Sequence, residues 1–177
     1  MIGVKEGPLE TGIERLKEGN YGWGMVFARI VLGHLYANPE LTENIHAIIP
    51  MPSFQPKKQP RQGNDHTGYV IERAIEEDDR NLPFVLDPPL IEKIRGTKKM
   101  RETGSGWERS RVAGHLYKRL NVPAPELVKD KNIMVYDDVF TGGNTLNAVA
   151  KRLKGAGAAE VWGLVLGRQQ WRERWKR

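Results

Sequence analysis

Three stretches of the chain repeat apolar residues at the spacing of an amphipathic helix. Residues 25–36 form the first, and Asn38-Pro39 ends it. Residues 67–75 form the second, and residues 107–120 carry a similar pattern. We therefore expect helices in these segments, the first of them within an N-terminal helical segment that spans residues 1–44.

Short apolar runs mark the expected strands. Residues 45–50, 133–136 and 161–166 are mostly apolar, as in strands of a parallel sheet that is buried on both faces. The first run ends at Pro50-Met51-Pro52, so we expect it to lead into a turn held by prolines. Residues 81–89 give a weaker strand pattern between turns. Turns at the carboxyl ends of parallel strands are where α/β proteins bind ligands.

The best-defined unit is a strand, a turn, a helix and a second strand over residues 133–166. The helix begins near Thr145, and Gly155 and Gly157 end it. One face of this helix is apolar, with Leu146, Val149, Ala150 and Leu153. The βαβ unit predicts an α/β fold: a single Rossmann-like domain over residues 1–177, with a central parallel sheet flanked by helices.

Composition narrows the class of protein. The 177 residues include 28 Lys and Arg against 22 Asp and Glu, a formal charge of +6, which favours anionic partners but does not separate nucleic acid from a phosphorylated metabolite. The chain has no cysteine, which excludes a disulfide scaffold, a zinc ribbon and a thiol nucleophile. No apolar run is long enough for a signal peptide or a membrane span, so we expect a cytoplasmic protein without a membrane partner.

The turn of the βαβ unit carries the candidate chemistry. Its sequence is Asp137-Asp138-Val139-Phe140-Thr141-Gly142-Gly143-Asn144-Thr145. Backbone N–H groups at such a junction converge with the helix dipole behind them, and glycines let an oxyanion approach. The hydroxyls of Thr141 and Thr145 add donors, which is the chemistry of a monophosphate site. Asp137 and Asp138 offer paired acceptors for vicinal ribose hydroxyls, directly or through a divalent cation.

Other interpretations of this turn stay open on local pattern alone. A strand–turn–helix junction needs glycines and an N-cap in any protein, and adjacent aspartates are common in solvated turns. A P-loop is disfavoured because no Gly-Lys-Ser/Thr follows the turn. A dinucleotide-binding fingerprint is disfavoured because the glycines lack its spacing.

The segment from Ile133 to Thr145 resembles the phosphoribosyl-pyrophosphate signature of type I phosphoribosyltransferases: four apolar residues, two acids and a Thr/Gly-rich loop. It differs from that signature at Tyr136 and Phe140, where smaller aliphatic residues are usual, and at Gly142, where the family often has a second Thr. The difference at Gly142 removes one hydroxyl donor and keeps the backbone donors of the loop.

Upstream segments resemble the competence-protein ComF branch of this family. Ile48-Ile49-Pro50-Met51-Pro52 is similar to its Pro-x-Pro motif, and Gln62-Gly63-Asn64 to its Arg-Gly-Phe-Asn motif without the aromatic residue. The branch usually has Asn where Arg111 stands, and this sequence has no counterpart of the cysteine-rich zinc module common in the branch. The likeness covers a core of about residues 45–168 and leaves a basic, Trp-containing tail at residues 169–177.

The resemblance implies a role for each loop. Thr141, Gly142, Gly143, Asn144 and Thr145 bind the 5-phosphate. The catalytic acids Asp137 and Asp138 face the ribose hydroxyls and bind Mg²⁺ indirectly. The pyrophosphate loop consists of Pro50, Met51, Pro52 and Ser53. A flexible basic loop with Arg95, Lys98 and Lys99 stabilises the departing pyrophosphate and excludes water.

Three functions compete. The first is an enzyme that transfers phosphoribose to a nitrogenous base and releases pyrophosphate. The second is a non-catalytic sensor of phosphoribosyl pyrophosphate or a nucleotide, which contacts DNA or a protein partner. The third, a general nucleic-acid binder, is least favoured, because we expect Trp171 and Trp175 of the tail to pack against the domain or against a second subunit of a homodimer.

Overall fold

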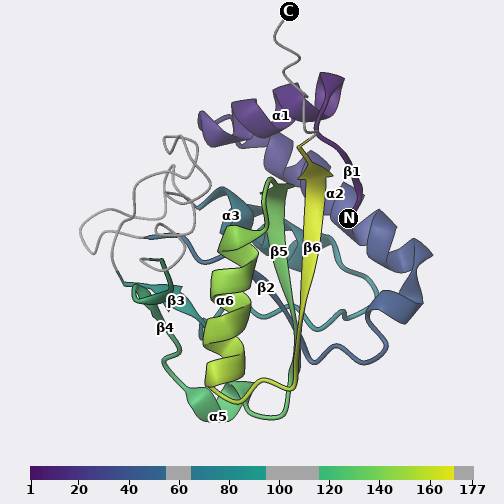
Figure 1. Cartoon of the computed structure of the whole chain (residues 1–177). Coiled ribbons are helices and arrows are strands. Elements are labelled where there is room, and N and C mark those ends of the chain that lie inside the picture. The colour runs from purple at the N-terminus through teal and green to yellow at the C-terminus, as the bar shows by residue number, and fades with distance from the viewer. Residues whose placement is uncertain (55–64, 95–115, 170–177) are drawn as a thin grey trace, which may run out of the picture.

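The computed structural model describes residues 1–54, 65–94 and 116–169 of the chain (Figure 1). Its centre is a four-stranded sheet in the order β1-β6-β5-β2, and each neighbouring pair of strands is parallel. The strands are β1 (Gly3–Val4), β2 (Ala47–Pro50), β5 (Asn132–Phe140) and β6 (Glu160–Arg168). Helices cover both faces of this sheet, which confirms the α/β fold with a central parallel sheet.

Helices account for most of the remaining regular structure. The longer ones are α1 (Gly7–Lys17), α2 (Gly22–Ala37), α3 (His66–Glu77) and α6 (Asn144–Gly155). The helices predicted over residues 25–36, over residues 67–75 and from Thr145 are confirmed as α2, α3 and α6. The short elements are η1 (Pro39–Leu41), β3 (Glu92–Lys93), β4 (Leu120–Asn121) and α5 (Pro125–Val128). Of these, β3 and β4 form a separate antiparallel pair.

The alternation of side chains along the strands divides the core in two. On one face, residues of α1, α2 and α3 cluster with Met134, Tyr136 and Leu164. On the other, residues of α6 cluster with Ile133 and Val135. Figure 1 shows α6 in front of the sheet, with α2 and α3 behind it and α1 beyond the carboxyl ends of β5 and β6. Burial on both faces explains the apolar runs in β5 and β6.

Two predicted elements differ in the structure. Residues 81–89 do not form a strand: Phe84 makes a single bridge to Ile48, because the prolines of this segment have no N–H to extend a ladder. The helix predicted over residues 107–120 does not reach its expected end, because Leu120 begins β4. Residues 107–115 of that prediction lie outside the described residues.

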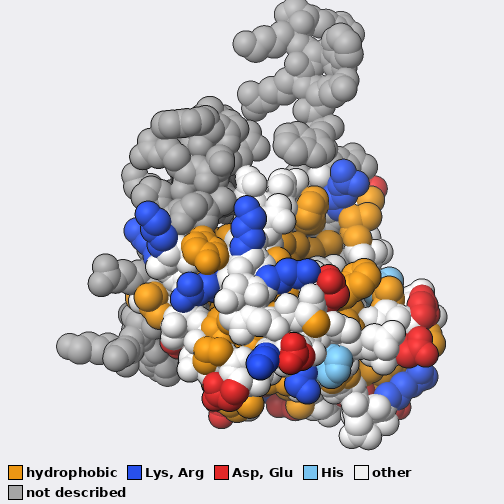
Figure 2. Space-filling model, turned by 60° about the horizontal axis from the view of Figure 1, so that its bottom comes forward, with side chains coloured by type: hydrophobic (Ala, Val, Ile, Leu, Met, Phe, Trp, Pro, Cys, Tyr) orange, Lys and Arg blue, Asp and Glu red, His pale blue; other side chains and the backbone are white. Residues whose placement is uncertain are grey.

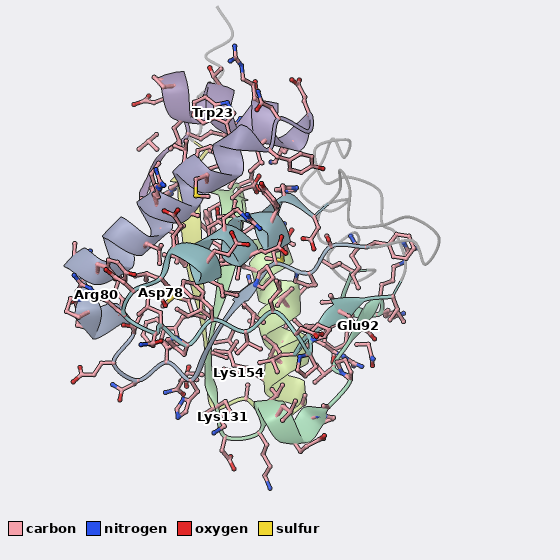
Figure 3. The ribbon with its side chains drawn as sticks, turned by 180° about the vertical axis from the view of Figure 1, so that it is seen from behind. Trp23, Asp78, Arg80, Glu92, Lys131 and Lys154 are labelled. Atoms are coloured by element: carbon pink, nitrogen blue, oxygen red, sulfur yellow. The ribbon has the colours of Figure 1, made fainter. Side chains whose placement is uncertain are left out.

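Tyr36, near the end of α2, anchors the loop that follows α3. Its hydroxyl donates to Asp78 Oδ1 at 2.6 Å, and the same carboxylate accepts the backbone N–H groups of Arg80 and Leu82. The guanidinium of Arg80 lies 4.1 Å from the centre of the Tyr36 ring. Figure 3 shows Asp78 and Arg80 together beside α2. These contacts fix the path of the chain from α3 back toward β2.

The surface at the amino ends of the strands is mixed in charge. Figure 2 shows Lys and Arg side chains there beside Asp and Glu side chains, with hydrophobic side chains between them. The net positive charge is therefore not gathered on this face. Over residues 1–54, 65–94 and 116–169, no helix combines the length and the apolar character that a membrane span requires.

Candidate functional site

The acid pair lies within β5, beyond the predicted end of the strand. Asp137 pairs with Val165 of β6, and the ladder continues to Phe140. Alternation along the strand directs Asp138 to the same side as Tyr136, toward α1 and α3. The two carboxyl groups are adjacent in sequence at the carboxyl edge of the sheet, and each lies close enough to affect the other.

Asp138 contacts two side chains from different helices, the ammonium group of Lys17 and the imidazole of His66. Its Oδ2 atom lies 2.5 Å from Nζ of Lys17, the last residue of α1, and 3.3 Å from Nε2 of His66, the first residue of α3. The Asp138 side chain is only 10% exposed. Burial alone raises the pKa of Asp138, but the hydrogen bond to His66 and the charge of Lys17 outweigh it and hold the pKa below its ordinary value.

Asp137 behaves in the opposite way. Burial raises the pKa of Asp137 well above its ordinary value, and the negative charge of Asp138 raises it further. Its Oδ1 atom accepts the backbone N–H of Asp138 at 2.9 Å. In this pair Asp138 keeps the negative charge, and Asp137 is the carboxyl group that holds a proton more readily.

Tyr136, which precedes the acids, is a packing residue. Its side chain is fully buried in the cluster formed with α1, α2 and α3, so the sequence-based expectation of strand packing is confirmed. Among the described residues its hydroxyl has no hydrogen-bond partner. Burial and the nearby carboxylates raise the pKa of Tyr136 well above its ordinary value.

The turn after β5 has the backbone geometry of an open helix N-terminus. Gly143 occupies the N-cap position of α6 with φ 72°, in the left-handed region, and no side chain caps the helix there. The Gly143 carbonyl accepts the first helical bond, from Asn147 at 2.8 Å. Thr141 and Gly142 are exposed, and Asn144 and Thr145 are partly exposed. The structure therefore brings the five predicted phosphate-binding residues to one exposed turn.

A glycine is required at Gly143 for a second reason. A Cβ atom there would lie 3.1 Å from the ring of Phe140. Phe140 is the position where the sequence departs from the small aliphatic residue usual in the signature. The aromatic ring therefore packs against the backbone of the turn. A surface hollow of about 640 Å³ begins at this turn and continues along β6 past Trp162 to Met1.

The Pro50–Ser53 turn follows β2, directly beside β5. The backbone N–H of Met51 donates to the Tyr136 carbonyl at 2.7 Å, and the Thr67 hydroxyl donates to the Met51 carbonyl at 3.0 Å. The turn therefore lies at the same edge of the sheet as the acid pair and next to the first turn of α3. It lines a pocket of about 230 Å³, whose lining also includes Asp65 and Lys93.

Lys93 brings a cation to this pocket from β3. Burial lowers the pKa of Lys93, and the charge of Arg119 lowers it further. The predicted cations Arg95, Lys98 and Lys99 lie outside the described residues, as does the tail at residues 170–177.

The described segments do not provide a complete set of protein ligands for a metal ion. No group of three or more His, Asp or Glu side chains is arranged there to hold one. Asp137 and Asp138 form a pair, and Mg²⁺ commonly binds through one or two carboxylates together with substrate phosphates and water. The donor set therefore fits a metal that arrives with a phosphorylated substrate.

The sequence analysis missed Lys17, His66 and Lys93 as candidate site residues. Lys17 is the last residue of a helix far upstream, and nothing in its local pattern marks it. Nothing in the local sequence marks His66 either, because its contact with Asp138 exists only in three dimensions. Lys93 belongs to the basic segment of residues 91–105 and was not selected as a site residue there, because its position beside the Pro50–Ser53 turn is visible only in the structure.

No protein-family model matches the chain, and no curated protein matches it. Among solved structures, the chain is similar to the allosteric regulatory enzyme of purine biosynthesis, with 18% sequence identity over 78% of this chain and a TM-score of 0.42. The chain spans 25% of the length of that protein. The α/β fold, a parallel sheet in the order β1-β6-β5-β2 with helices on both faces, rests on the strand pairing of the chain itself.

Proposed function

We propose that this chain is a Mg²⁺-dependent phosphoribosyltransferase, which binds 5-phosphoribosyl-1-pyrophosphate at the carboxyl edge of β5. One observation carries the proposal. The acid pair, of which Asp138 is buried and Asp137 is partly exposed, is followed closely by a helix N-terminus whose N-cap, Gly143, leaves the backbone donors without a side-chain cap. Acceptors for ribose hydroxyls and donors for a phosphate are thus a few residues apart, as a phosphorylated sugar requires.

The proposal assigns the phosphate, ribose and pyrophosphate groups of the donor to separate parts of the site. The 5-phosphate binds the turn from Thr141 to Thr145, where helix N–H groups and the dipole of α6 stabilise its charge. The ribose hydroxyls donate to the acid pair. The pyrophosphate binds beside the Pro50–Ser53 turn, where Lys93 lines the same pocket.

The reaction forms a bond between the anomeric carbon and a nitrogen of the acceptor base, and it breaks the bond from that carbon to the pyrophosphate oxygen. The leaving pyrophosphate takes the electron pair of the broken bond, so negative charge grows on it, and cations at the β2 edge stabilise that charge. Mg²⁺, when bound with the donor, neutralises part of the same charge. The acceptor nitrogen loses a proton in this step, and Asp137 in its ionised form is the stronger base of the acid pair because its pKa is raised.

Calorimetric titration of phosphoribosyl pyrophosphate with Mg²⁺ tests the binding step. We expect the wild-type protein to bind, and the double variant Asp137→Asn/Asp138→Asn to bind about a hundredfold more weakly, because the charged acceptor Asp138 and the carboxyl oxygens of Asp137 are both lost. The matched control is Glu126→Gln/Asp130→Asn, which removes the same charge near α5 and should bind as wild type. If the folded wild type gives no heat of binding, the proposal is refuted.

A non-catalytic sensor of the same ligand is the second candidate. The specific observation that favours it is the engagement of Asp138 by Lys17 and His66, which leaves a carboxylate of lowered pKa that is a weak proton acceptor. A screen of pyrophosphate release across purine and pyrimidine bases separates the two functions. Release with any base supports the enzyme, and binding without release by any base supports the sensor.

A further inference from the structure

Lys17 approaches the site from α1, a helix outside the signature segment. Its Nζ lies 2.5 Å from Asp138 Oδ2, and its side chain is 38% exposed while that of Asp138 is 10% exposed. The ammonium group is therefore the solvent-facing partner of a buried carboxylate. It sits on a flexible stem and can turn outward toward a ligand without leaving the site.

The packing of α1 holds Lys17 in this position. Its neighbour Leu16 and the preceding Ile13 are buried in the core between helices and sheet. Gly12 lies directly against Trp23 of α2, where a Cβ atom would come within 2.6 Å of the indole ring (Figure 3). Figure 1 shows α1 lying across the carboxyl ends of β5 and β6. These contacts fix the last turn of α1, so the fold holds the Lys17 side chain next to the acid pair.

Contacts made by the first turn of α3 connect Asp138 with the pyrophosphate turn. His66 Nε2 lies 3.3 Å from Asp138 Oδ2. The next residue, Thr67, donates its hydroxyl to the Met51 carbonyl at 3.0 Å. The path from Asp138 through the first turn of α3 therefore reaches the Pro50–Ser53 turn. The N-terminus of α6 and its candidate phosphate turn lie on the other face of the sheet.

We propose that Lys17 binds the pyrophosphate group of the donor, and that it forms its ion pair with Asp138 while no donor is present. This inference rests on the proposed function and adds to it a binding residue from α1. When the donor binds, Lys17 exchanges the carboxylate for a phosphate oxygen, and Asp138 accepts a ribose hydroxyl in its place. Lys17 keeps an anionic partner at each stage and the buried Asp138 keeps a hydrogen-bond donor, which limits the desolvation cost.

The test compares two ligands on matched variants. Phosphoribosyl pyrophosphate with Mg²⁺, and ribose 5-phosphate alone, are titrated into wild type, Lys17→Gln, Lys17→Arg and Lys154→Gln. Lys154 is the control because it also pairs with an acid, Glu160, at 3.1 Å, and it lies at the opposite end of the sheet (Figure 3). Circular dichroism confirms that each variant is folded at the titration temperature.

We expect Lys17→Gln to bind phosphoribosyl pyrophosphate about tenfold more weakly, because one charge-assisted hydrogen bond is lost. Its affinity for ribose 5-phosphate should stay within about twofold of wild type, because that ligand lacks the pyrophosphate. Lys17→Arg should retain most of the affinity, and Lys154→Gln should bind both ligands as wild type. A role in packing alone would instead weaken both ligands equally.

The outcomes separate this inference from the function on which it rests. If wild type binds the donor and Asp137→Asn/Asp138→Asn does not, the proposed site stands. Unchanged or tighter donor binding by Lys17→Gln would then overturn the role of Lys17 alone, as would an equal loss for both ligands. If wild type binds no donor, the function and the role of Lys17 are both rejected.

Discussion

Two neighbouring aspartates in one strand have opposite electrostatic environments. Lys17 and His66 lie next to the Asp138 carboxylate, whereas the main charged neighbour of Asp137 is Asp138 itself. The direct contacts with Lys17 and His66 are therefore the cause of the difference. A pair of acids that looks symmetric in sequence therefore has one member that keeps its charge and one that resists ionisation.

Substitution of each acid by asparagine should change stability in opposite directions. The folded-state pKa of Asp138 is lowered, so its stabilisation is present above the ordinary carboxyl pKa and is lost as the pH falls. We expect Asp138→Asn to lower the free energy of unfolding by about 2 kcal/mol at pH 7, the value of a hydrogen bond to a charged group. Urea unfolding at pH 7 and pH 3 measures this difference, which should shrink at pH 3.

Asp137→Asn should do the reverse. The folded-state pKa of Asp137 is raised, so its ionisation opposes folding at every pH above the ordinary carboxyl pKa. The variant should be more stable than wild type at pH 7, and this gain should vanish at pH 3, where both states of the wild type hold the proton. Equal losses for both single variants at pH 7 would contradict the opposite environments of the two acids.

The buried hydroxyl of Tyr136 gives a further expectation at this scale. It is fully buried and has no hydrogen-bond partner among the described residues, so its desolvation is not compensated. We expect Tyr136→Phe to raise the free energy of unfolding by about 1 kcal/mol, because an unsatisfied polar group is removed without a change in packing. Thermal and urea unfolding test this, and a loss of stability would mean that the hydroxyl is bonded in the folded state.

Residue-level prediction from the sequence succeeds where the residues are neighbours along the chain. Asp137, Asp138 and the turn from Thr141 to Thr145 share one strand–turn–helix junction, so their common location could be predicted. Lys17 and His66 reach Asp138 from distant segments through the packing of α1 and α3. Contacts of this kind depend on how helices cross the sheet, which local patterns do not specify.

At the scale of elements, the predictions depend on periodicity. The helices α2, α3 and α6 each bury one apolar face, and that face is visible as a repeat in the sequence. β5 was predicted too short, because its last residues include Asp137 and Asp138, whose charges suggest a turn although they still pair with β6. Residues 81–89 were predicted as a weak strand between turns. Leu82 and Phe84 do pack on the core, but the prolines of the segment prevent a ladder.

The N-terminus of α6 permits a prediction at the level of a single element. Gly143 has φ 72°, and a Cβ atom would lie 3.1 Å from the Phe140 ring. We expect Gly143→Ala to destabilise the protein by about 1–2 kcal/mol, the cost of a left-handed backbone for a residue with a side chain. Donor binding should weaken as well, because the turn must shift to relieve the contact with Phe140.

Gly155→Ala at the other end of α6 is the matched control. A Cβ atom there would meet the Tyr117 hydroxyl at 3.8 Å, an ordinary contact. Gly155 lies within the helix, where alanine is favoured over glycine by about 0.5–1 kcal/mol. The control should therefore be neutral or stabilising and should bind the donor as wild type. Equal effects of the two substitutions in urea unfolding and calorimetry would contradict the special role of Gly143.

At the scale of the whole molecule, the two cores share the same sheet. The cluster around α1, α2 and α3 and the cluster around α6 contact opposite faces of β5 and β6. Neither set of helices can separate from the sheet without exposing apolar strand residues such as Tyr136 or Val135. The N-terminal helices are thus part of the structure that supports the candidate site, because α1 and α3 supply Lys17 and His66, which contact Asp138.

This shared sheet predicts that the described part of the protein unfolds as one unit. Leu35 of α2 is 1% exposed in the first cluster, and Leu153 of α6 is fully buried in the second. Leu35→Ala and Leu153→Ala should each lower the free energy of unfolding by about 2–5 kcal/mol through lost burial and a residual cavity. Each variant should still show a single transition, because loss of either cluster exposes one face of β5 and β6 and removes support for the other.

Differential scanning calorimetry, with circular dichroism and tryptophan fluorescence as independent probes, measures this cooperativity. The probes should give coincident transitions, and the calorimetric enthalpy should equal the van't Hoff enthalpy in both variants. An early transition in Leu153→Ala that leaves the α1–α3 side folded would show that the two faces are independent. In that case the turn at Gly143 could melt while Lys17 and His66 stayed on Asp138, and donor binding would be lost before the fold. Coincident loss of donor binding and of structure is the outcome that a shared sheet requires.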